Sequence, residues 1–410
     1  MSVPTILISG GGPVGLTLAG LLDVGRGDCR VVVVEPHEPP RWNPAETGLR
    51  VYALSRSSQH ALDRAGAWPP IAARRASPYE RMRVWEGDAP GGLGSIEFDC
   101  AEIGEPNLGH IVEDVLIRDA LLERLAGSAR VRVVTGTAID AIDVRRDAVV
   151  AALSNGETVR AQLVVAADGA RSPVRTMLGL PTVARGYGQH AIVTHVVTER
   201  PHERTAWQRF VPGGPIALLP LADGRSSVVW SLPTARAEAL AAASDEDFIA
   251  ALEDATGRVL GRLGPISPRG RFPLQVLHAM RYCCPRGVLV GDAAHVVHPL
   301  AGQGMNLGLA DAACLAGEID RALVNGLDVG DLAVLRRYER RRKADNVDML
   351  VALDALHHLF RLPGAAAVLR AVGLSVVDTA GPAKRWFARR ALGLHLDCEG
   401  YRGTDDRAAA

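Results

Sequence analysis

Apolar positions at the start of the chain follow a strand, turn, helix and strand order. Residues Thr5–Ser9 form a continuous apolar run that ends in three glycines, and apolar side chains then recur at helical spacing until Gly25. The next run, Arg30–Glu35, is β-branched and apolar on both faces, as a parallel strand buried between two layers should be. The pattern predicts that a βαβ unit opens the protein.

The following stretch predicts a return to this first sheet. A proline-rich connection leads to a helix over Ser55–Gly66, and a mixed region extends to about Gly109. A helix over Ile117–Ala126 precedes the strand VRVVT, and Asn155-Gly156 then supplies a hairpin turn. The buried strand LVVAA comes next, and we expect it to lie in the first sheet.

The pattern changes between Thr182 and Leu277. Long alternating strands, HAIVTHVV, TAWQRFV and SSVVWSL, are separated by Pro-Gly turns and one helical insert near Glu238 to Ala255, which predicts a largely antiparallel second unit. The segment GVLVGDAAH then resembles another buried strand ending in a loop. From Asn306 the pattern is helical to about Leu394.

Composition and charge narrow the function classes. The 46 basic and 46 acidic residues cancel, so no whole-molecule field favours a nucleic acid, and we expect no nucleic-acid partner. A hydrophobic content of 48% excludes a disordered chain. The six cysteines show no CxxC spacing, and neither a signal peptide nor an apolar run of about 18 residues is present. We therefore expect a reduced, cytoplasmic protein whose membrane contact, if any, is peripheral at the inner membrane.

The turn after the first strand carries Gly10-x-Gly12-x-x-Gly15, and Glu35 ends the second strand. Gly10 permits the turn, Gly12 lets a pyrophosphate approach the backbone, and Gly15 lets the helix pack closely. The helix N-terminus offers N–H groups to phosphates, and Glu35 can accept hydrogen bonds from both hydroxyls of an adenosine ribose. The motif predicts a bound dinucleotide and leaves open whether it is NAD or FAD.

Two later motifs decide between these cofactors. Asp168-Gly169-Ala170-Arg171-Ser172 follows LVVAA, and GDAAHVVHPLAGQGMN runs from Gly291 to Asn306. At these residues the chain resembles the class A flavoprotein aromatic hydroxylases, the para-hydroxybenzoate hydroxylase fold, and most closely the ubiquinone-biosynthesis hydroxylases. LRVYALSRSSQHALDRAGAW, LGHIVEDVLIRDAL, WQRFVPGGPIALLPL and YERRRKADN extend the resemblance over nearly the whole chain. Asp114 is a departure, because many relatives carry Asn there.

The resemblance implies an α/β fold with a Rossmann-type, glutathione-reductase-like FAD-binding domain, an inserted antiparallel β-sheet substrate domain and a C-terminal helical segment. We expect the FAD-binding domain over residues 1–181, with part of the substrate domain near 70–110. The substrate sheet is expected over 182–277, a return to the FAD-binding domain over 278–320, and the helical region over 321–410.

The resemblance also implies which residues hold FAD. Asp292 would bond the ribitol chain, and the segment from Pro299 to Asn306 would lie along the isoalloxazine ring. Gly302 and Gly304 open a helix there, so its N–H groups would stabilise negative charge on the N1/O2 edge of a reduced flavin. The motif containing Asp168 is linked to both FAD and the transient visit of NAD(P)H. The candidate FAD-binding residues are Gly10, Gly12, Gly15, Glu35, Arg50, Arg118, Asp168, Gly291, Asp292, Pro299, Gly302, Gln303, Gly304, Met305 and Asn306.

Several other residues are given structural roles. His295 and His298 are three apart, but their segment offers no further ligand except Asp292, so no metal is predicted. Each of three aromatic residues on the second unit's strands is assigned to the core rather than to a substrate cavity: Trp207, Phe210 and Trp230.

Two basic stretches near the C-terminus are interpreted differently. The run Arg336–Lys343 is assigned to a solvated helix face. The stretch GPAKRWFARRALG contains Lys384, Arg385, Arg389 and Arg390 beside Trp386 and Phe387, which is the composition of a helix lying on an anionic membrane surface. A role for this stretch in contacting the membrane or a biosynthetic-complex partner is left open.

We therefore expect an FAD-dependent monooxygenase of ubiquinone biosynthesis. NAD(P)H would reduce the flavin, dioxygen would form the flavin C4a-hydroperoxide, and one oxygen would pass to the ring of a prenylated phenol or benzoquinol. No single catalytic side chain can be named. Two alternatives are a hydroxylase of a small soluble aromatic compound and a non-catalytic flavin-binding scaffold. The sequence leaves open the ring carbon, NADH versus NADPH, the prenyl chain length and a homodimer.

Overall fold

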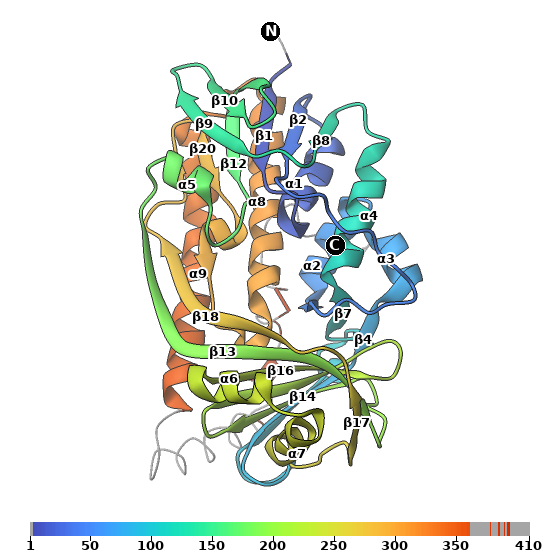
Figure 1. The fold of residues 1–410 in the computed structure, drawn as a ribbon. Helices are drawn as coiled ribbons and strands as arrows, with labels where there is room; N and C mark the ends of the chain where they lie inside the picture. The colour runs from blue at the N-terminus through green and yellow to red at the C-terminus, as the bar shows by residue number, and fades with distance from the viewer. Residues whose placement is uncertain (1–2, 361–377, 379–383, 386–388, 390–391, 394–410) are drawn as a thin grey trace.

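The computed structural model describes residues 3–360 and, beyond them, residues 378, 384–385, 389 and 392–393. Two large β-sheets lie one above the other along the molecule, with two long helices running beside them (Figure 1). These helices are α8 (Gln303–Val324) and α9 (Leu332–Leu359).

The first sheet has six strands in the order β19-β20-β12-β1-β2-β8. All neighbours pair in parallel except β19, which pairs antiparallel to β20 at the edge. The strands are β1 (Thr5–Ser9), β2 (Arg30–Val34), β8 (Val131–Val134), β12 (Leu163–Ala166), β19 (Cys283–Cys284) and β20 (Gly287–Leu289). The expected opening βαβ unit is confirmed, with α1 (Pro13–Asp23) between β1 and β2, and LVVAA does return to this sheet beside β1.

Helices and a small sheet cover the first sheet from opposite sides (Figure 1). Helices α1, α8 and α4 (Asp114–Ala126) lie behind it in the view, and β9 (Ile139–Val144), β10 (Val149–Leu153) and β11 (Thr158–Ala161) lie in front. Because both faces are covered, the strands are apolar throughout, and Ile6, Leu7 and Ile8 are completely buried.

The second sheet has nine strands in the order β21-β18-β13-β16-β15-β14-β5-β6, with β17 also paired to β13. Its pairings are antiparallel except that of β14 with β5. The strands are β5 (Arg81–Glu86), β6 (Ser95–Asp99), β13 (Thr182–Thr198), β14 (Thr205–Val211), β15 (Gly214–Pro220), β16 (Ser226–Pro233), β17 (Leu263–Ile266), β18 (Gly270–Ala279) and β21 (His295–Val296).

The helical insert on this sheet differs from the expectation. The sequence predicts one helix near Glu238 to Ala255, whereas the structure has two, α6 (Thr234–Ala242) and α7 (Asp245–Thr256). Ala243 is extended between them, and the Ser244 side chain accepts the N–H of Asp247 at the start of α7. The break arises because this serine forms an N-cap instead of continuing the helix.

The two faces of the second sheet bury different aromatic residues. Trp207 and Trp230 alternate onto the face covered by α6 and α7, where they pack in one cluster with Phe248. This confirms their assignment to the core. Phe210 packs against a separate cluster that includes Leu300 and Leu353.

The remaining elements connect the two large sheets. Strands β3, β7 and β4 form a small antiparallel sheet. Their bounds and those of the other short elements are β3 (Val51–Leu54), α2 (Arg56–Arg64), α3 (Trp68–Arg75), β4 (Ser77–Tyr79), η1 (Cys100–Ile103), β7 (Gly109–Glu113), α5 (Pro173–Met177), η2 (Gly291–Ala293) and η3 (Pro299–Ala301).

One histidine in the small sheet predicts a pH dependence of stability. His110 lies edge-on to Trp68, and burial, with a smaller contribution from the charge of Arg56, lowers its pKa to about 4. In the unfolded chain the His110 ring binds a proton near pH 6.5. The stability that the folded state has with a neutral His110 is therefore complete above that pH and is lost as the pH falls toward 4. Between these pH values the free energy of unfolding should fall less in His110→Gln than in the parent protein, by about 1–2 kcal/mol. The difference is this small because part of the ring is open to solvent. Urea titrations at several pH values measure it, with exposed His37→Gln as the control; equal slopes in both variants would contradict the assignment.

Candidate cofactor and substrate site

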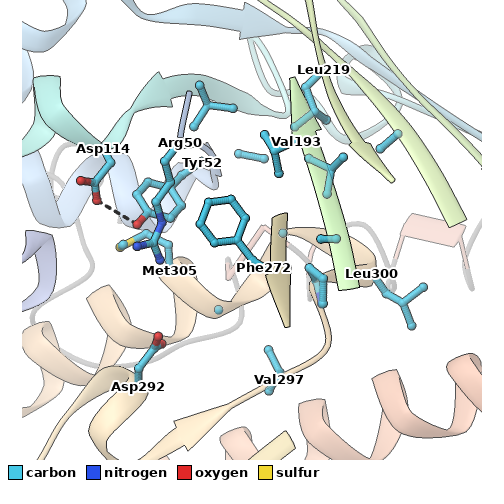
Figure 2. Close-up of a pocket in the computed structure, with 18 of the residues that line it drawn as sticks. Arg50, Tyr52, Asp114, Val193, Leu219, Phe272, Asp292, Val297, Leu300 and Met305 are labelled. Carbon is cyan, nitrogen blue, oxygen red and sulfur yellow. Dashed lines mark hydrogen bonds between the residues drawn. The ribbon is translucent and has the colours of Figure 1, made fainter. Parts of the chain in front are cut away.

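A single cavity of about 550 Å³ runs between the two large sheets. Figure 2 shows Asp292 and Met305 on one side of it, Val193 and Leu219 of the second sheet on the other, and the Phe272 ring between them. The first side is polar, and the second is mostly apolar. The cavity can therefore hold a polar cofactor next to an apolar substrate.

Two helices begin at this cavity with glycine N-caps. Gly12 caps α1 and Gly302 caps α8, neither helix has a side-chain cap, and neither has an acidic residue in its first turn. Both caps line the cavity. The helices also pack closely, because a Cβ on Gly308 of α8 would lie 2.8 Å from the Val14 side chain. Two segments far apart in sequence thus direct unpaired N–H groups into one space.

The glycines of the first motif have two different functions. Gly10 has φ +110°, and a Cβ there would lie 2.4 Å from the carbonyl oxygen of Ala167, while a Cβ on Gly15 would lie 2.1 Å from that of Gly10. These two permit the turn and close helix packing. A Cβ on Gly12 would meet nothing within 4 Å, and the same holds for Gly304. Side chains at these two positions would project into cavity space, so both glycines keep room for a ligand.

Glu35 contacts the glycine turn. Its carboxylate accepts the N–H of Gly11 at 2.7 Å and that of His37 at 3.2 Å. The side chain therefore lies beside the turn at the end of β2, where the sequence motif expects it. In the described structure it is next to the cavity rather than part of its lining.

Arg50, Tyr52 and Asp114 form a polar group at the cavity wall (Figure 2), and Arg118 also lines the cavity. The Tyr52 hydroxyl donates to Asp114 at 2.9 Å, Arg118 donates to the other oxygen at 2.8 Å, and the Arg50 guanidinium lies 5.2 Å from the centre of the Tyr52 ring. Burial raises the pKa of Tyr52, so its hydroxyl remains a donor. Asp114 can accept both bonds, and the charges of Asp114 and Asp292 act on the buried Arg50 guanidinium.

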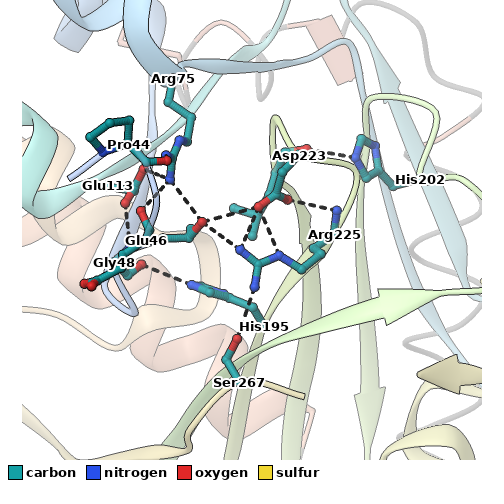
Figure 3. A network of polar contacts seen from close by, with 12 residues as sticks. Pro44, Glu46, Gly48, Arg75, Glu113, His195, His202, Asp223, Arg225 and Ser267 are labelled. Atoms are coloured by element: carbon teal, nitrogen blue, oxygen red, sulfur yellow. Dashed lines mark hydrogen bonds and ion pairs between the residues drawn. The ribbon is translucent and has the colours of Figure 1, made fainter. Parts of the chain in front are cut away.

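The loop that leads to Arg50 is held by hydrogen bonds from α3 and from the second sheet (Figure 3). Arg75 donates to the carbonyl oxygen of Glu46 at 2.7 Å, and the Nε2 of His195 lies 3.1 Å from the carbonyl oxygen of Gly48. Burial lowers the pKa of His195, so the ring donates as a neutral imidazole. These contacts fix the backbone just before Arg50.

A buried ion-pair network supports the GDAAH loop. Asp311 on α8 accepts the N–H of Gly291 at 3.0 Å and the Nε2–H of His295 at 2.5 Å. Its second oxygen accepts from Arg342 at 2.8 Å and from Asn346 at 3.1 Å, both on α9. Burial alone would raise the pKa of Asp311, but the charges of His295 and Arg342 lower it to about 2. The loop before Asp292 is thereby held to two helices.

This network corrects the interpretation of the basic run on α9. Arg336, Arg337, Arg340 and Arg341 are exposed as expected, but Arg342 is completely buried. A run of charged residues usually predicts a solvent-exposed helix face. In a helix packed against the protein, however, some position in each turn faces the interior, and in this turn that position is Arg342. The signal for a partner was present in the sequence: Asp311 is a lone acid within an apolar stretch of α8.

The Asp168 motif contacts the GDAAH loop. Asp168 accepts the N–H of Val174 at 3.2 Å through one oxygen, and its other oxygen is buried without a hydrogen-bond partner among the described residues. Burial raises the pKa of Asp168. Arg175, from the same motif, donates to the carbonyl oxygen of Ala293 at 2.9 Å and so ties this motif to the GDAAH loop.

The predicted site residues separate into two sets. Eight line the cavity directly: Gly12, Arg50, Arg118, Asp292, Pro299, Gly302, Gly304 and Met305. The others shape it from behind, in the described part of the chain: Gly10, Gly15, Glu35, Asp168, Gly291, Gln303 and Asn306.

Asn306 shows what the second set does. Its oxygen accepts from the N–H of Ser55 and the hydroxyl of Ser58, and its amide donates to the carbonyl oxygens of Ala53 and Gly302. These four hydrogen bonds use both acceptor positions of the side-chain oxygen and both N–H groups of the amide. The structure therefore gives Asn306 a role in holding α8 against β3 and α2.

The described residues fit an FAD molecule. Two uncapped helix starts lie at one cavity, with Gly12 and Gly304 facing open space, and a buried oxygen of Asp168 without a described partner lies behind the lining residues Ala167 and Gly169. His295 and His298 contact Asp311 and Gln189 respectively.

Comparisons with known proteins agree with this geometry. The family model described as FAD binding domain matches residues 3–350. The chain is 41% identical to ubiquinone hydroxylase UbiL of Rhodospirillum rubrum over 393 residues, covering 95% of this chain and 90% of that protein. It is 36% identical to 3-demethoxyubiquinol 3-hydroxylase of Escherichia coli, covering 95% of this chain and 98% of that protein.

Solved structures show the same fold. The p-nitrophenol 4-monooxygenase PnpA of Pseudomonas putida superimposes with a TM-score of 0.76 at 21% identity, covering 98% of this chain and 99% of that chain. PqsL of Pseudomonas aeruginosa, a probable FAD-dependent monooxygenase, gives a TM-score of 0.74 at 26% identity, covering 92% and 100%. The chain belongs to the class A flavoprotein aromatic hydroxylases that bind FAD, within the ubiquinone-biosynthesis hydroxylase family.

Proposed function

We propose that this protein hydroxylates the ring of a prenylated phenol or benzoquinol in ubiquinone biosynthesis, using FAD, NAD(P)H and O₂. The observation that supports this most is the continuity of the cavity, whose polar side leads without a break onto the apolar face of the second sheet. The relatives named as a ubiquinone hydroxylase and a 3-demethoxyubiquinol 3-hydroxylase each align with 95% of this chain.

Bound FAD would supply the chemistry with NAD(P)H and dioxygen. The protein's own residues would orient the reactants. The N–H groups at the starts of α1 and α8 favour negative charge beside Gly12 and Gly304. Asp292 and Arg118 offer hydrogen bonds along the polar side, and Val193, Leu219 and Phe272 exclude water from the opposite side.

The proposal includes the domain division given above, a cytoplasmic location and peripheral contact at the inner membrane. Within the described residues, no helix is long and apolar enough to cross a membrane. Lys384 is buried and pairs with Glu102 and Asp378, whereas Arg385 and Arg389 are exposed. The rest of GPAKRWFARRALG lies mostly outside the described residues. Flotation of the protein with anionic vesicles tests this contact, and gel filtration tests the homodimer.

Anaerobic mixing with NADPH and then exposure to air tests the function. We expect a short-chain prenylated phenol to be converted to a product heavier by one oxygen atom, as seen by mass spectrometry. Hydroxylation of an unprenylated phenol at equal or greater efficiency would favour the small-aromatic alternative. A flavin that NADH and NADPH both fail to reduce, with or without a phenol, would favour the scaffold.

A further inference from the structure

The sheet side of the cavity is apolar except at two positions. Along β14 and β16 alternate side chains line the cavity, and among the lining residues contributed by the second sheet the polar ones are Gln208 and Ser231. Their cavity-lining neighbours on the intervening and adjacent strands are small or apolar, as Ala217 and Val229 illustrate. Two hydrogen-bonding groups thus stand alone in apolar surroundings.

Both side chains face the cavity without a protein partner. Gln208 is 8% exposed and Ser231 is 2% exposed, and neither side chain forms a hydrogen bond with another described residue. Neither is among the buried side-chain atoms without a partner, so their polar groups open onto the cavity. A ligand that fills the cavity displaces water from these groups, and its binding is weakened unless it supplies hydrogen bonds in place of that water.

The spacing of the two groups matches a ring with oxygens at opposite positions. Gln208 pairs with Ala217, which pairs with Val229, and Ser231 lies two residues beyond Val229 on the same face. Standard strand spacings place the Cα atoms of Gln208 and Ser231 about 12 Å apart. Two para oxygens about 5.5 Å apart, each with a hydrogen bond of about 2.8 Å, span about 11 Å.

We propose that Gln208 and Ser231 bind the two ring oxygens of the substrate and thereby select which ring carbon faces the flavin. The inference rests on the proposed function and adds the residues that set its specificity. An amide and a hydroxyl each donate and accept, so they can bind a phenol hydroxyl or a quinone carbonyl. They orient the ring without taking its proton.

The holoenzyme with bound FAD provides the test, using 2-prenylhydroquinone and prenylbenzene, which lacks ring oxygens, as probes. Binding is read from the perturbation of the flavin absorbance. We expect Gln208→Met and Ser231→Ala each to weaken hydroquinone binding about 10-fold while leaving prenylbenzene binding and FAD content unchanged. Both variants should also consume more NADPH for each hydroxylated product. Gln275→Met is the matched control, because Gln275 neighbours the cavity-lining Leu274 on β18 and so points to the opposite face.

Three outcomes would overturn the inference. If the unmodified enzyme prefers the hydroquinone and both variants keep that preference as Gln275→Met does, the assignment is wrong and the proposed function stands. If the unmodified enzyme hydroxylates the hydroquinone but binds prenylbenzene equally well, ring-oxygen recognition is absent. If the unmodified enzyme neither binds nor hydroxylates the hydroquinone, the proposed function fails together with the inference.

Discussion

Replacing Gly304 by leucine is expected to produce a folded protein without flavin. Gly304 lines the cavity at the second position of α8, and a Cβ there would meet nothing within 4 Å. A leucine side chain would therefore occupy the space that we assign to the flavin ring. We expect the dissociation constant for FAD to rise about 10- to 100-fold, because overpacking a formed site costs about 1–3 kcal/mol.

Gly317 supplies a matched control in the same helix. A Cβ at this position also meets nothing within 4 Å, but Gly317 does not line the cavity in the described structure. We expect Gly317→Leu to retain FAD and to be as stable as the parent or more so, since leucine favours a helix over glycine. The measurement is FAD titration of each apoprotein, with circular dichroism to confirm folding. Equal FAD affinity in both variants would show that α8 does not begin at the cofactor.

The second large effect is expected at Asp311. Asp311→Leu would remove one of the two carboxylates that pair with the completely buried Arg342 guanidinium, leaving Asp345 at 2.9 Å, and it would release the N–H of Gly291. Breaking a buried pair from one side typically costs about 3–5 kcal/mol. We expect a loss of that size in the free energy of unfolding, measured by urea denaturation of the apoprotein. FAD retention should fall as well, because the loop before Asp292 loses its support.

Two comparisons separate this effect from a general loss of charge. Asp143→Ala removes an exposed ion pair with Arg145, 2.8 Å long, and should change the free energy of unfolding by about 1 kcal/mol or less. The double variant Asp311→Leu with Arg342→Leu should be less destabilised than the sum of the two single variants, because both members of the buried pair are removed together. A loss at Asp311 no larger than that at Asp143 would contradict the role of the network.

Local patterns predicted the elements that hold the cofactor. The strand TAWQRFV has the bounds of β14, Thr205–Val211, and the opening motif places Gly10 and Gly15 where backbone conformation or contacts require glycine. The positive φ of Gly10 and the contact of Gly15 with Gly10 are local features of the turn. The break before α7 was also readable, because Ser244 followed by Asp247 is a recognisable N-cap pattern.

Contacts between distant segments were not predictable in this way. Burial of Arg342 depends on Asp311 lying on a different helix, and three of the four hydrogen bonds of Asn306 reach segments about 250 residues away in sequence. The parallel pairing of β5 with β14 likewise joins two distant parts of the chain. Gln208 carries no sequence signal at all, because its importance comes from apolar neighbours on other strands.

A crystal structure of the protein with FAD tests the central claim most directly. The account predicts one FAD per chain, with its diphosphate against Gly12 and Val14 at the start of α1 and its ring edge against Gly302, Gly304 and Met305 at the start of α8. The adenosine ribose should lie beside Glu35. An FAD that contacts only one of these helix starts, or that binds outside this cavity, would contradict it.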